Sequence, residues 1–162
     1  MPSDPPAALR SAMPEDIERV RALFLEYAQW LKVDLCFQGF DRELAGLPGA
    51  YAPPRGRLIV AGVPGEAFCC IALRPLGAPA LADVGEVKRL YVQPSHRGEG
   101  WGRRLAEAVI ADARAIGYRE LKLDTLDWMA DARRLYAKLG FRECDRYYDN
   151  PLAGVVYMSL EL

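Results

Sequence analysis

The chain has 162 residues, of which 51% are hydrophobic and 27% are charged, and its formal net charge at pH 7 is −1. This length and composition predict one compact soluble domain over residues 1–162, long enough to bury a sizeable core. The near-neutral charge argues against a general nucleic-acid binder, which normally carries a basic surface. No apolar run reaches the length of a membrane span, so we expect no membrane partner.

The cysteines and the first residues add little chemistry. Cys36, Cys69, Cys70 and Cys144 lack the spacing and the neighbouring histidines of a metal site, so we expect no metal. Cys69 and Cys70 are adjacent in an apolar run and should point to opposite faces of a strand as packing residues. No basic segment followed by an apolar stretch opens the sequence, so the expected location is the cytoplasm.

The first third of the sequence predicts a short strand followed by two helices. Residues 7–13 suit a first strand. Pro14 precedes acidic residues and then apolar residues at helical spacing as far as Leu31, which predicts an amphipathic helix. Residues 41–47 predict a shorter helix, and residues 51–56 read as a loop.

Strands are predicted in the middle of the sequence. Two β-type runs, residues 57–63 and 66–73, are joined across Pro64-Gly65 and predict a hairpin. Residues 76–81 read as a loop, and residues 84–92 predict a further strand.

The last third alternates between helical and strand patterns. Helical periodicity covers residues 101–116, alternation predicts a strand around residues 121–125, and helical spacing returns over residues 132–139. Residues 141–146 and 155–162 are the last predicted strands. The whole pattern indicates one mixed α/β domain.

A glycine-rich loop, Arg97-Gly98-Glu99-Gly100-Trp101-Gly102, lies between a predicted strand and a predicted helix. Glycines let the backbone approach a ligand closely, and the amides at a helix start favour phosphate oxygens. Arg97 and Arg103 would add positive charge at the two ends of the loop. The segment therefore predicts a site for a pyrophosphate group.

Three alternatives compete with this interpretation. The dinucleotide fingerprint requires Gly-x-Gly-x-x-Gly, whereas the spacing here is Gly-x-Gly-x-Gly and position 103 is arginine. The loop of nucleoside triphosphatases requires Gly-Lys followed by Ser or Thr, which is absent here. A purely structural glycine turn is the third alternative.

The loop resembles the Gln/Arg-x-x-Gly-x-Gly/Ala signature of the GNAT superfamily of N-acetyltransferases. A second family landmark, Tyr-x-x-x-Gly-Phe, is matched by Tyr136 to Phe141, in the family's order and at its usual separation. The resemblance covers residues 57–162 well and the amino-terminal helices in general pattern only. It implies an α/β (α+β) fold with a mixed central sheet of about six to seven strands flanked by about four helices, and acetyl-coenzyme A as cosubstrate.

The resemblance also implies residue roles. Tyr136 falls on the general-acid tyrosine that protonates the coenzyme sulfur, and Glu86 falls on a glutamate that assists amine deprotonation. The alternatives are a core aromatic for Tyr136 and, for Glu86, a strand glutamate that is solvated or salt-bridged near Lys88 and Arg89. The residues implied to contact the cosubstrate are Leu90, Tyr91, Val92, Arg97, Gly98, Glu99, Gly100, Trp101, Gly102 and Arg103.

Two positions near the motifs do not support a direct role. His96, the sole histidine, lies beside the loop and is poorly placed for chemistry. Met129 stands where the family often has an asparagine that touches the coenzyme, and methionine cannot supply that hydrogen bond.

Two segments are candidates for the acceptor pocket, residues 147–151 and residues 37–41. Their aromatic and acidic residues would suit a cationic amine, although turn and packing roles are equally compatible. Tyr27, Trp30 and Trp128 are expected in the core or at an interface.

The predicted function is acetyl transfer from acetyl-coenzyme A to a primary amine of a small molecule, directly within a ternary complex. The alternatives are a non-catalytic acyl-coenzyme A sensor and an acetyltransferase acting on protein amino termini or on a charged tRNA. The tRNA alternative expects a basic face, which the net charge does not indicate. We predict no nucleic-acid partner and regard a homodimer formed through the last strands as compatible with the fold.

Overall fold

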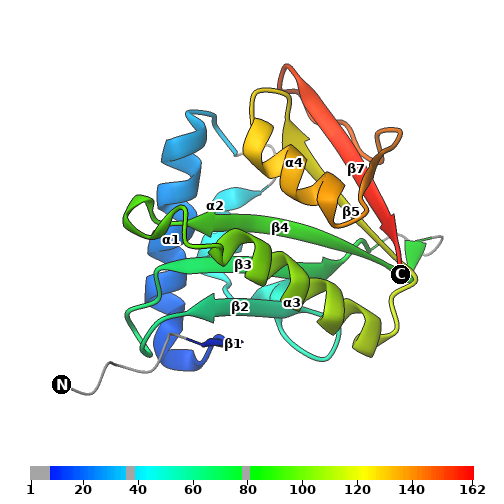
Figure 1. The fold of residues 1–162 in the computed structure, drawn as a ribbon. Helices are drawn as coiled ribbons and strands as arrows, with labels where there is room; N and C mark the ends of the chain where they lie inside the picture. Colours follow the sequence, from blue (N-terminus) through cyan, green and yellow to red (C-terminus); the bar gives the residue numbers. More distant parts are fainter. Residues whose placement is uncertain (1–7, 36–38, 78–80) are drawn as a thin grey trace.

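The computed structural model describes residues 8–35, 39–77 and 81–162. Within them, a seven-stranded sheet has the order β1-β2-β3-β4-β5-β7-β6, with α1 and α2 on one face and α3 and α4 on the other (Figure 1). This architecture confirms the predicted mixed sheet flanked by helices. The strands are β1 (Leu9–Ser11), β2 (Arg57–Ala61), β3 (Cys69–Pro75), β4 (Val84–Val92), β5 (Glu120–Leu126), β6 (Arg142–Glu143) and β7 (Val155–Glu161), and the helices are α1 (Ile17–Leu31), α2 (Phe40–Ala45), α3 (Trp101–Ile116) and α4 (Ala130–Lys138).

Each face of the sheet carries its own hydrophobic core. Leu105 and Val109 of α3 pack on one face, and Phe24 of α1 packs on the other. Cys69 belongs to the first core and Cys70 to the second, which confirms that these neighbours point to opposite faces. Burial raises the pKa of the Cys69 thiol to about 12. Both thiols therefore act as small core residues.

A buried carboxylate fixes the start of α1. Asp16 ends a short 3-10 turn that begins at Pro14, and its side chain is fully buried. Its oxygens accept bonds from Arg10 at 2.6 and 2.9 Å, from the Met13 amide at 2.8 Å and from the Gly65 amide at 2.9 Å. The Arg10 hydrogen bond in particular holds the pKa of Asp16 well below its usual range. This carboxylate joins β1, α1 and the loop between β2 and β3.

Several predicted strands are shorter in the structure. Strand β1 ends at Ser11 and β2 at Ala61, each two residues before its predicted end. Strand β3 begins at Cys69 because a turn closed by the bond from the Glu66 amide to the Val63 carbonyl, 2.8 Å, occupies the preceding residues. Strand β6 covers only Arg142–Glu143. The chain after it leaves the sheet and places residues 147–150 beside β4 and β5, as described below. No helix in the described part of the chain is long and apolar enough to cross a membrane.

The parallel strands β4 and β5 stay together only at one end. Three residue pairs join them, from Val84–Glu120 to Glu86–Lys122, and the strands diverge beyond that point (Figure 1). On its other edge, β4 carries a bulge: the register with β3 shifts between Cys70 and Ala72, and Arg89 has a φ of +60°. The divergence opens the middle of the sheet next to the glycine-rich loop.

Candidate active site

The opening between β4 and β5 contains two adjoining cavities. The inner cavity has a volume of about 60 Å³ and the outer cavity about 360 Å³, and both are lined by Leu90, Met129 and Ala132. Beyond Glu86 and Lys122 the two strands share no paired residues, so backbone groups on their facing edges remain for another partner. The outer cavity has the size of a small-molecule site, and the inner one admits only a few atoms of a ligand.

The glycine-rich loop borders the outer cavity and presents amides to it. Gly98 and Gly100 have φ values of +81° and +85°, which favour glycine, and a Cβ on either would meet no atom within 4 Å. Gly100 begins α3 without a side-chain cap. Among the residues that the structure describes, the amides from Gly98 to Arg103 donate to no protein acceptor. The loop and the positive helix end therefore fit a diphosphate group.

The two predicted arginines lie at the ends of this loop. The Arg97 Nε donates to the Val92 carbonyl at 3.0 Å, and its guanidinium lies over the rings of Trp30 and Tyr91 at 5.2 and 5.7 Å. Arg103 is exposed and paired with Glu107 at 2.8 Å. Arg97 thus faces the outer cavity, whereas the charge of Arg103 is partly balanced on the surface.

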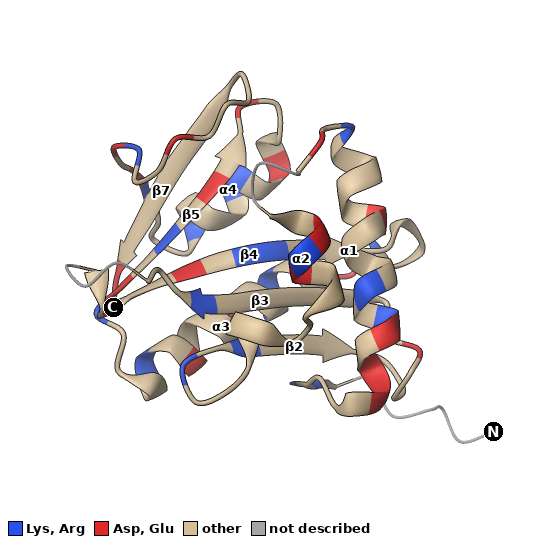
Figure 2. Cartoon of the chain, turned by 180° about the vertical axis from the view of Figure 1, so that it is seen from behind, with Lys and Arg blue, Asp and Glu red and all other residues tan. Residues whose placement is uncertain are grey.

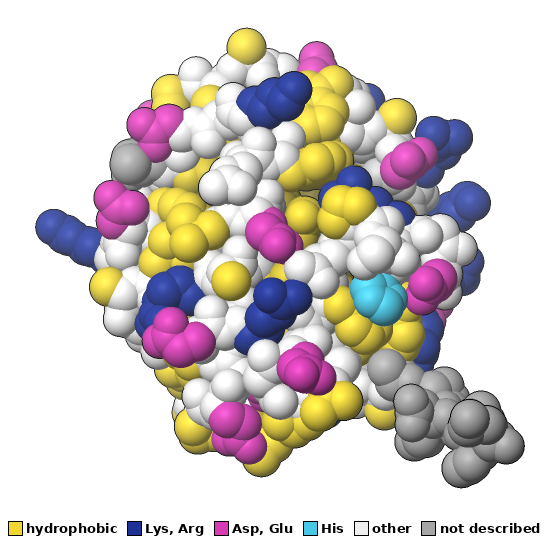
Figure 3. Space-filling view, turned by 90° about the vertical axis from the view of Figure 1, so that its left-hand side faces the viewer, with side chains coloured by type: hydrophobic (Ala, Val, Ile, Leu, Met, Phe, Trp, Pro, Cys, Tyr) yellow, Lys and Arg dark blue, Asp and Glu magenta, His cyan; other side chains and the backbone are white. Residues whose placement is uncertain are grey.

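Aromatic contacts hold the loop in shape. His96 stacks on Phe68 with 3.8 Å between ring centroids, and Phe68 meets the ring of Trp101 edge-on at 5.0 Å (Figure 3, His96 in cyan). The Glu99 carboxylate accepts a 2.9 Å bond from Trp101 Nε1. Of the predicted cosubstrate residues, all except Glu99 and Arg103 line the outer cavity.

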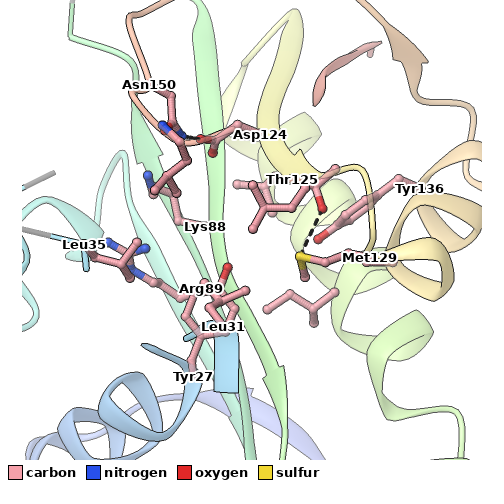
Figure 4. A pocket seen from close by; sticks show the side chains of 15 residues that line it. Tyr27, Leu31, Leu35, Lys88, Arg89, Asp124, Thr125, Met129, Tyr136 and Asn150 are labelled. Carbon is pink, nitrogen blue, oxygen red and sulfur yellow. Dashed lines mark hydrogen bonds between the residues drawn. The ribbon is translucent and has the colours of Figure 1, made fainter. Parts of the chain in front are cut away.

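Tyr136 reaches the inner cavity from α4. The Phe141 amide bonds to the Tyr136 carbonyl at 3.0 Å, and Gly140 takes a φ of +101° at the helix end, which explains the spacing of the Tyr-x-x-x-Gly-Phe landmark. The rings of Tyr136 and Phe141 meet edge-on with 5.5 Å between their centroids. Burial raises the pKa of Tyr136, so its hydroxyl stays protonated at neutral pH. That hydroxyl makes no hydrogen bond to another described residue and lies near Thr125 and Met129 (Figure 4).

Met129 occupies the junction of the two cavities. Its sulfur accepts a bond from the Thr125 hydroxyl at 3.5 Å, and it lines both cavities. An apolar side chain therefore lines both cavities at the position that was predicted to lack the usual amide.

Glu86 is buried, but it lines neither cavity. Its Oε1 accepts a 2.9 Å bond from Arg74, and its Oε2 accepts a 2.6 Å bond from the Tyr147 hydroxyl. The ion pair therefore forms with Arg74, not with Lys88 or Arg89, its neighbours on β4. Direct abstraction of a proton by Glu86 stays a prediction, because its two carboxylate oxygens accept bonds from Arg74 and Tyr147 and its side chain lines neither cavity.

The inner cavity also contains charged residues that sequence reasoning missed, Lys88, Arg89 and Asp124. Asp124 Oδ2 accepts hydrogen bonds from the Tyr148 hydroxyl and, at 2.9 Å, from Asn150 Nδ2. The alternation of β5 was a usable signal, since Asp124 follows Leu123 and must face away from the core that holds it. No local signal indicates that residues so far apart in the sequence meet.

The predicted acceptor segments are only partly described. From residues 147–151, Asn150 lines the inner cavity, and the two tyrosines hold Glu86 and Asp124. Of residues 37–41, the first two lie outside the described residues, and Phe40 is buried beneath the Arg89 guanidinium. In the described ranges, no group of three or more histidine, cysteine, aspartate or glutamate side chains is arranged to hold a metal ion.

Trp30 and Trp128 were expected in the core or at an interface, and the structure excludes the core for both of them. They are 39% and 53% exposed, and their rings contact each other at an interplanar angle of 56° with 5.4 Å between ring centroids. Trp30 lies in the last turn of α1 and lines the outer cavity, and Trp128 precedes α4. The pair therefore bridges the two sides of the opening. Tyr27, in contrast, lines the inner cavity and meets Tyr91 edge-on at 6.2 Å.

Comparisons with known proteins agree with this geometry. Residues 17–141 match the model of the acetyltransferase (GNAT) family. An uncharacterised N-acetyltransferase of Schizosaccharomyces pombe is 41% identical over 151 residues, covering 93% of this chain and 91% of that protein. The structure of a GNAT-family acetyltransferase from Staphylococcus aureus has a TM-score of 0.77 at 18% identity, covering 96% of this chain and 98% of the other. A Salmonella typhimurium putative acetyltransferase, solved with acetyl-coenzyme A, has a TM-score of 0.73 at 19% identity, covering 96% and 93%. The chain therefore belongs to the GNAT acetyltransferase family and is an acyltransferase.

Proposed function

We propose that this enzyme transfers an acetyl group from acetyl-coenzyme A to a primary amine of a small molecule while both are bound. The observation that carries the proposal is a pair of adjoining cavities between the separated strands, the outer bordered by unpaired amides of the glycine-rich loop and the inner lined by Tyr136. The Salmonella protein of the same fold that holds acetyl-coenzyme A supports this choice of cosubstrate.

Each part of the cosubstrate would meet a matching part of the chain. The amides from Gly98 to Arg103 and the Arg97 guanidinium would hold the diphosphate. The edge of β4 over residues 90–92, which has no partner on β5, would pair with the amides of the pantetheine arm. The acetyl group would then lie at the junction of the two cavities, beside Met129 and Tyr136.

The reaction balances with the residues in place. The amine nitrogen forms a bond to the thioester carbonyl carbon, and the carbon–sulfur bond breaks with its electron pair going to sulfur. Tyr136 is protonated and would give its proton to that sulfur, regaining one from solvent. Starting from a protonated amine, the products are an amide, a free thiol and one proton. Holding both reactants in adjoining cavities supplies the orientation that such a step requires.

Glu86 would act through Tyr147. The 2.6 Å bond between them ties β4 to the segment that carries Asn150 into the inner cavity. In its predicted role, Glu86 would receive the amine proton by way of the Tyr147 hydroxyl. The ion pair with the half-buried Arg74 keeps the Glu86 carboxylate oriented toward that hydroxyl.

Calorimetric titration with acetyl-coenzyme A, on protein shown to be free of co-purified ligand, tests the proposal. We expect saturable binding of one molecule per chain. Gly100→Asp would place a negative charge beside the diphosphate and should weaken binding at least about tenfold. Gly117→Asp is the matched control, because Gly117 also has a positive φ, +109°, and open space, but lies at the opposite end of α3.

Thiol release in the presence of amines then separates the candidate functions. An enzyme releases coenzyme A when an acceptor amine is added, whereas an acyl-coenzyme A sensor binds without releasing it. Absence of binding by empty, folded protein contradicts the proposal altogether.

A further inference from the structure

Lys88 and Arg89 form a basic wall in the inner cavity. Adjacent residues of a strand normally point to opposite faces, but the bulge in β4 and the φ of +60° at Arg89 interrupt that alternation. Both side chains line the inner cavity and are only 6% and 4% exposed. Figure 2 shows this blue stretch of β4 beside the charged turn of α2.

Arg89 is fixed with part of its guanidinium still available. Its Nε and Nη2 donate to the two oxygens of Glu43 at 2.8 and 3.1 Å, and the Tyr51 hydroxyl also donates to Glu43 at 2.8 Å. Burial, the largest single effect, disfavours the charge, but the hydrogen bonds to Glu43 and the attraction of its carboxylate, with smaller contributions from Tyr51 and Tyr27, together raise the pKa of Arg89. Its Nη1 makes no hydrogen bond with any described residue. Arg89 is therefore a rigid, permanent cation that can still donate to an anion.

A carboxylate stands on the opposite strand. Asp124 uses Oδ2 for Tyr148 and Asn150, whereas its Oδ1 has no hydrogen bond in the ranges that the structure describes. Lys88 and Asp124 extend from neighbouring strands into the same space (Figure 4). Burial lowers the pKa of Lys88, and the nearby carboxylates of Glu86 and Asp124 act in the opposite direction. The inner cavity thus has a doubly basic side and an acidic side.

We infer that the acceptor is a small molecule that carries a carboxylate close to its amino group, as an amino acid does. This inference rests on the proposed function. The carboxylate would bind to Lys88 and Arg89 Nη1, and the amino group would face Asp124 Oδ1, within reach of the thioester at the cavity junction. Lys88, Arg89 and Asp124 are thus specificity-determining residues for the acceptor.

Other amines fit this cavity less well. An amine without an anionic group would bring a further positive charge into a buried space that already holds Lys88 and Arg89, and it would offer their donor groups no anion to bind. A protein amino terminus has a peptide carbonyl where the basic wall requires a carboxylate. The small volume of the inner cavity, about 60 Å³, also favours a compact acceptor.

The first experiment compares matched acceptors on the wild-type enzyme. Each of the common amino acids is assayed beside its amide and its decarboxylated amine, with thiol release giving kcat/KM and calorimetry giving acetyl-coenzyme A binding. We expect at least one amino acid to exceed both of its analogues by about tenfold or more, because a charge-assisted bond is lost in each analogue.

The second experiment removes the positive charge of Lys88. Lys88→Met should reduce the preference for the amino acid over its amide at least about tenfold, and Lys88→Arg should restore most of it. Lys122→Met is the matched control: Lys122 lies on β5, pairs with Glu120 at 3.0 Å and lines neither cavity, so the preference should persist. If Lys88→Met does not fold, the wild-type comparison still decides.

Every outcome bears on the inference. If acetyl-coenzyme A binds and amides or simple amines react as well as the amino acids, the inference is overturned and the proposed function stands. The same holds if amides or simple amines react and no carboxylate-bearing amine does. If acetyl-coenzyme A does not bind, the proposed function fails and takes the inference with it. If the Lys88→Met enzyme still prefers the amino acid over its amide, the basic wall does not take part in acceptor recognition.

Discussion

Replacing Tyr136 by phenylalanine removes one oxygen atom from the inner cavity and little else. The hydroxyl makes no hydrogen bond with another described residue, so no protein group loses a partner. The ring keeps its edge-on contact with Phe141 at 5.5 Å. We therefore expect the free energy of unfolding to change by less than about 0.5 kcal/mol, whereas emptying such a buried site would cost about 3–5 kcal/mol.

The expected effect on catalysis is much larger. Without the phenol, water must protonate the departing thiolate, and kcat should fall about 100-fold, or about 2.7 kcal/mol in activation free energy. The dissociation constant of acetyl-coenzyme A should change less than about twofold, since the loop amides are untouched. Because burial raises the pKa of Tyr136, its ionisation should cause no loss of wild-type activity below about pH 10. Single-turnover thiol release at saturating substrates measures the chemical step directly.

Tyr118→Phe is the matched control. Its hydroxyl donates to the Arg55 carbonyl at 2.7 Å, outside both cavities, so this variant should lose about 1 kcal/mol of stability and no activity. A Tyr136→Phe enzyme that keeps its single-turnover rate would refute the proton-donor role. The aromatic ring without its hydroxyl would then be sufficient for activity, and Tyr136 would be a packing residue.

Three further predictions concern the framework around the site. Asp16→Ala should lower the free energy of unfolding by about 3 kcal/mol in denaturant titrations. Because the pKa of Asp16 is lowered in the folded state, its contribution is complete above about pH 4 and lost as pH falls further, so the two stability curves should converge in acid. Gly85→Ala places a Cβ 3.0 Å from Leu121 Cδ2 and should cost about 1–3 kcal/mol; an unchanged melting curve contradicts this. Glu86→Gln and Tyr147→Phe should each lower kcat/KM about tenfold, and the double variant should be no worse than either, because Glu86 acts through Tyr147; additive losses would separate the two residues.

Much of the fold followed from the sequence because its longest elements have strong patterns and clear ends. Strand β4 and helix α3 have the predicted bounds, and Gly117, which ends α3, takes a positive φ, as terminating glycines do. Strand β6 is shorter than predicted because alternation does not say where a strand leaves the sheet. Its departure is accompanied by a side-chain contact between Tyr148 and Asp124, 24 residues apart.

Some parts of the site could likewise be predicted from neighbouring residues, whereas others depend on contacts between residues far apart in the sequence. The glycine-rich loop and the Tyr136 landmark are contiguous, and their backbone geometry is set by neighbouring residues. The partners of Glu86 are 12 and 61 residues away, which spacing rules do not reach. The basic wall could not be predicted either, because a bulge with an arginine at positive φ defeats the alternation on which strand predictions depend.

Because β4 and β5 pair over only a short stretch, the sheet has two parts that can move relative to each other at the unpaired end. Three residue pairs join these strands, whereas β5 and β7 are joined by seven, so the β5-β7-β6 unit is attached to the rest of the sheet mainly at one end. A ligand lying between the strands would brace the free ends against each other. Slowed hydrogen exchange along β4 beyond Glu86, together with a rise in melting temperature that grows with ligand concentration, would report this bracing. The cosubstrate would then stabilise the separated ends of β4 and β5 as well as donate the acetyl group.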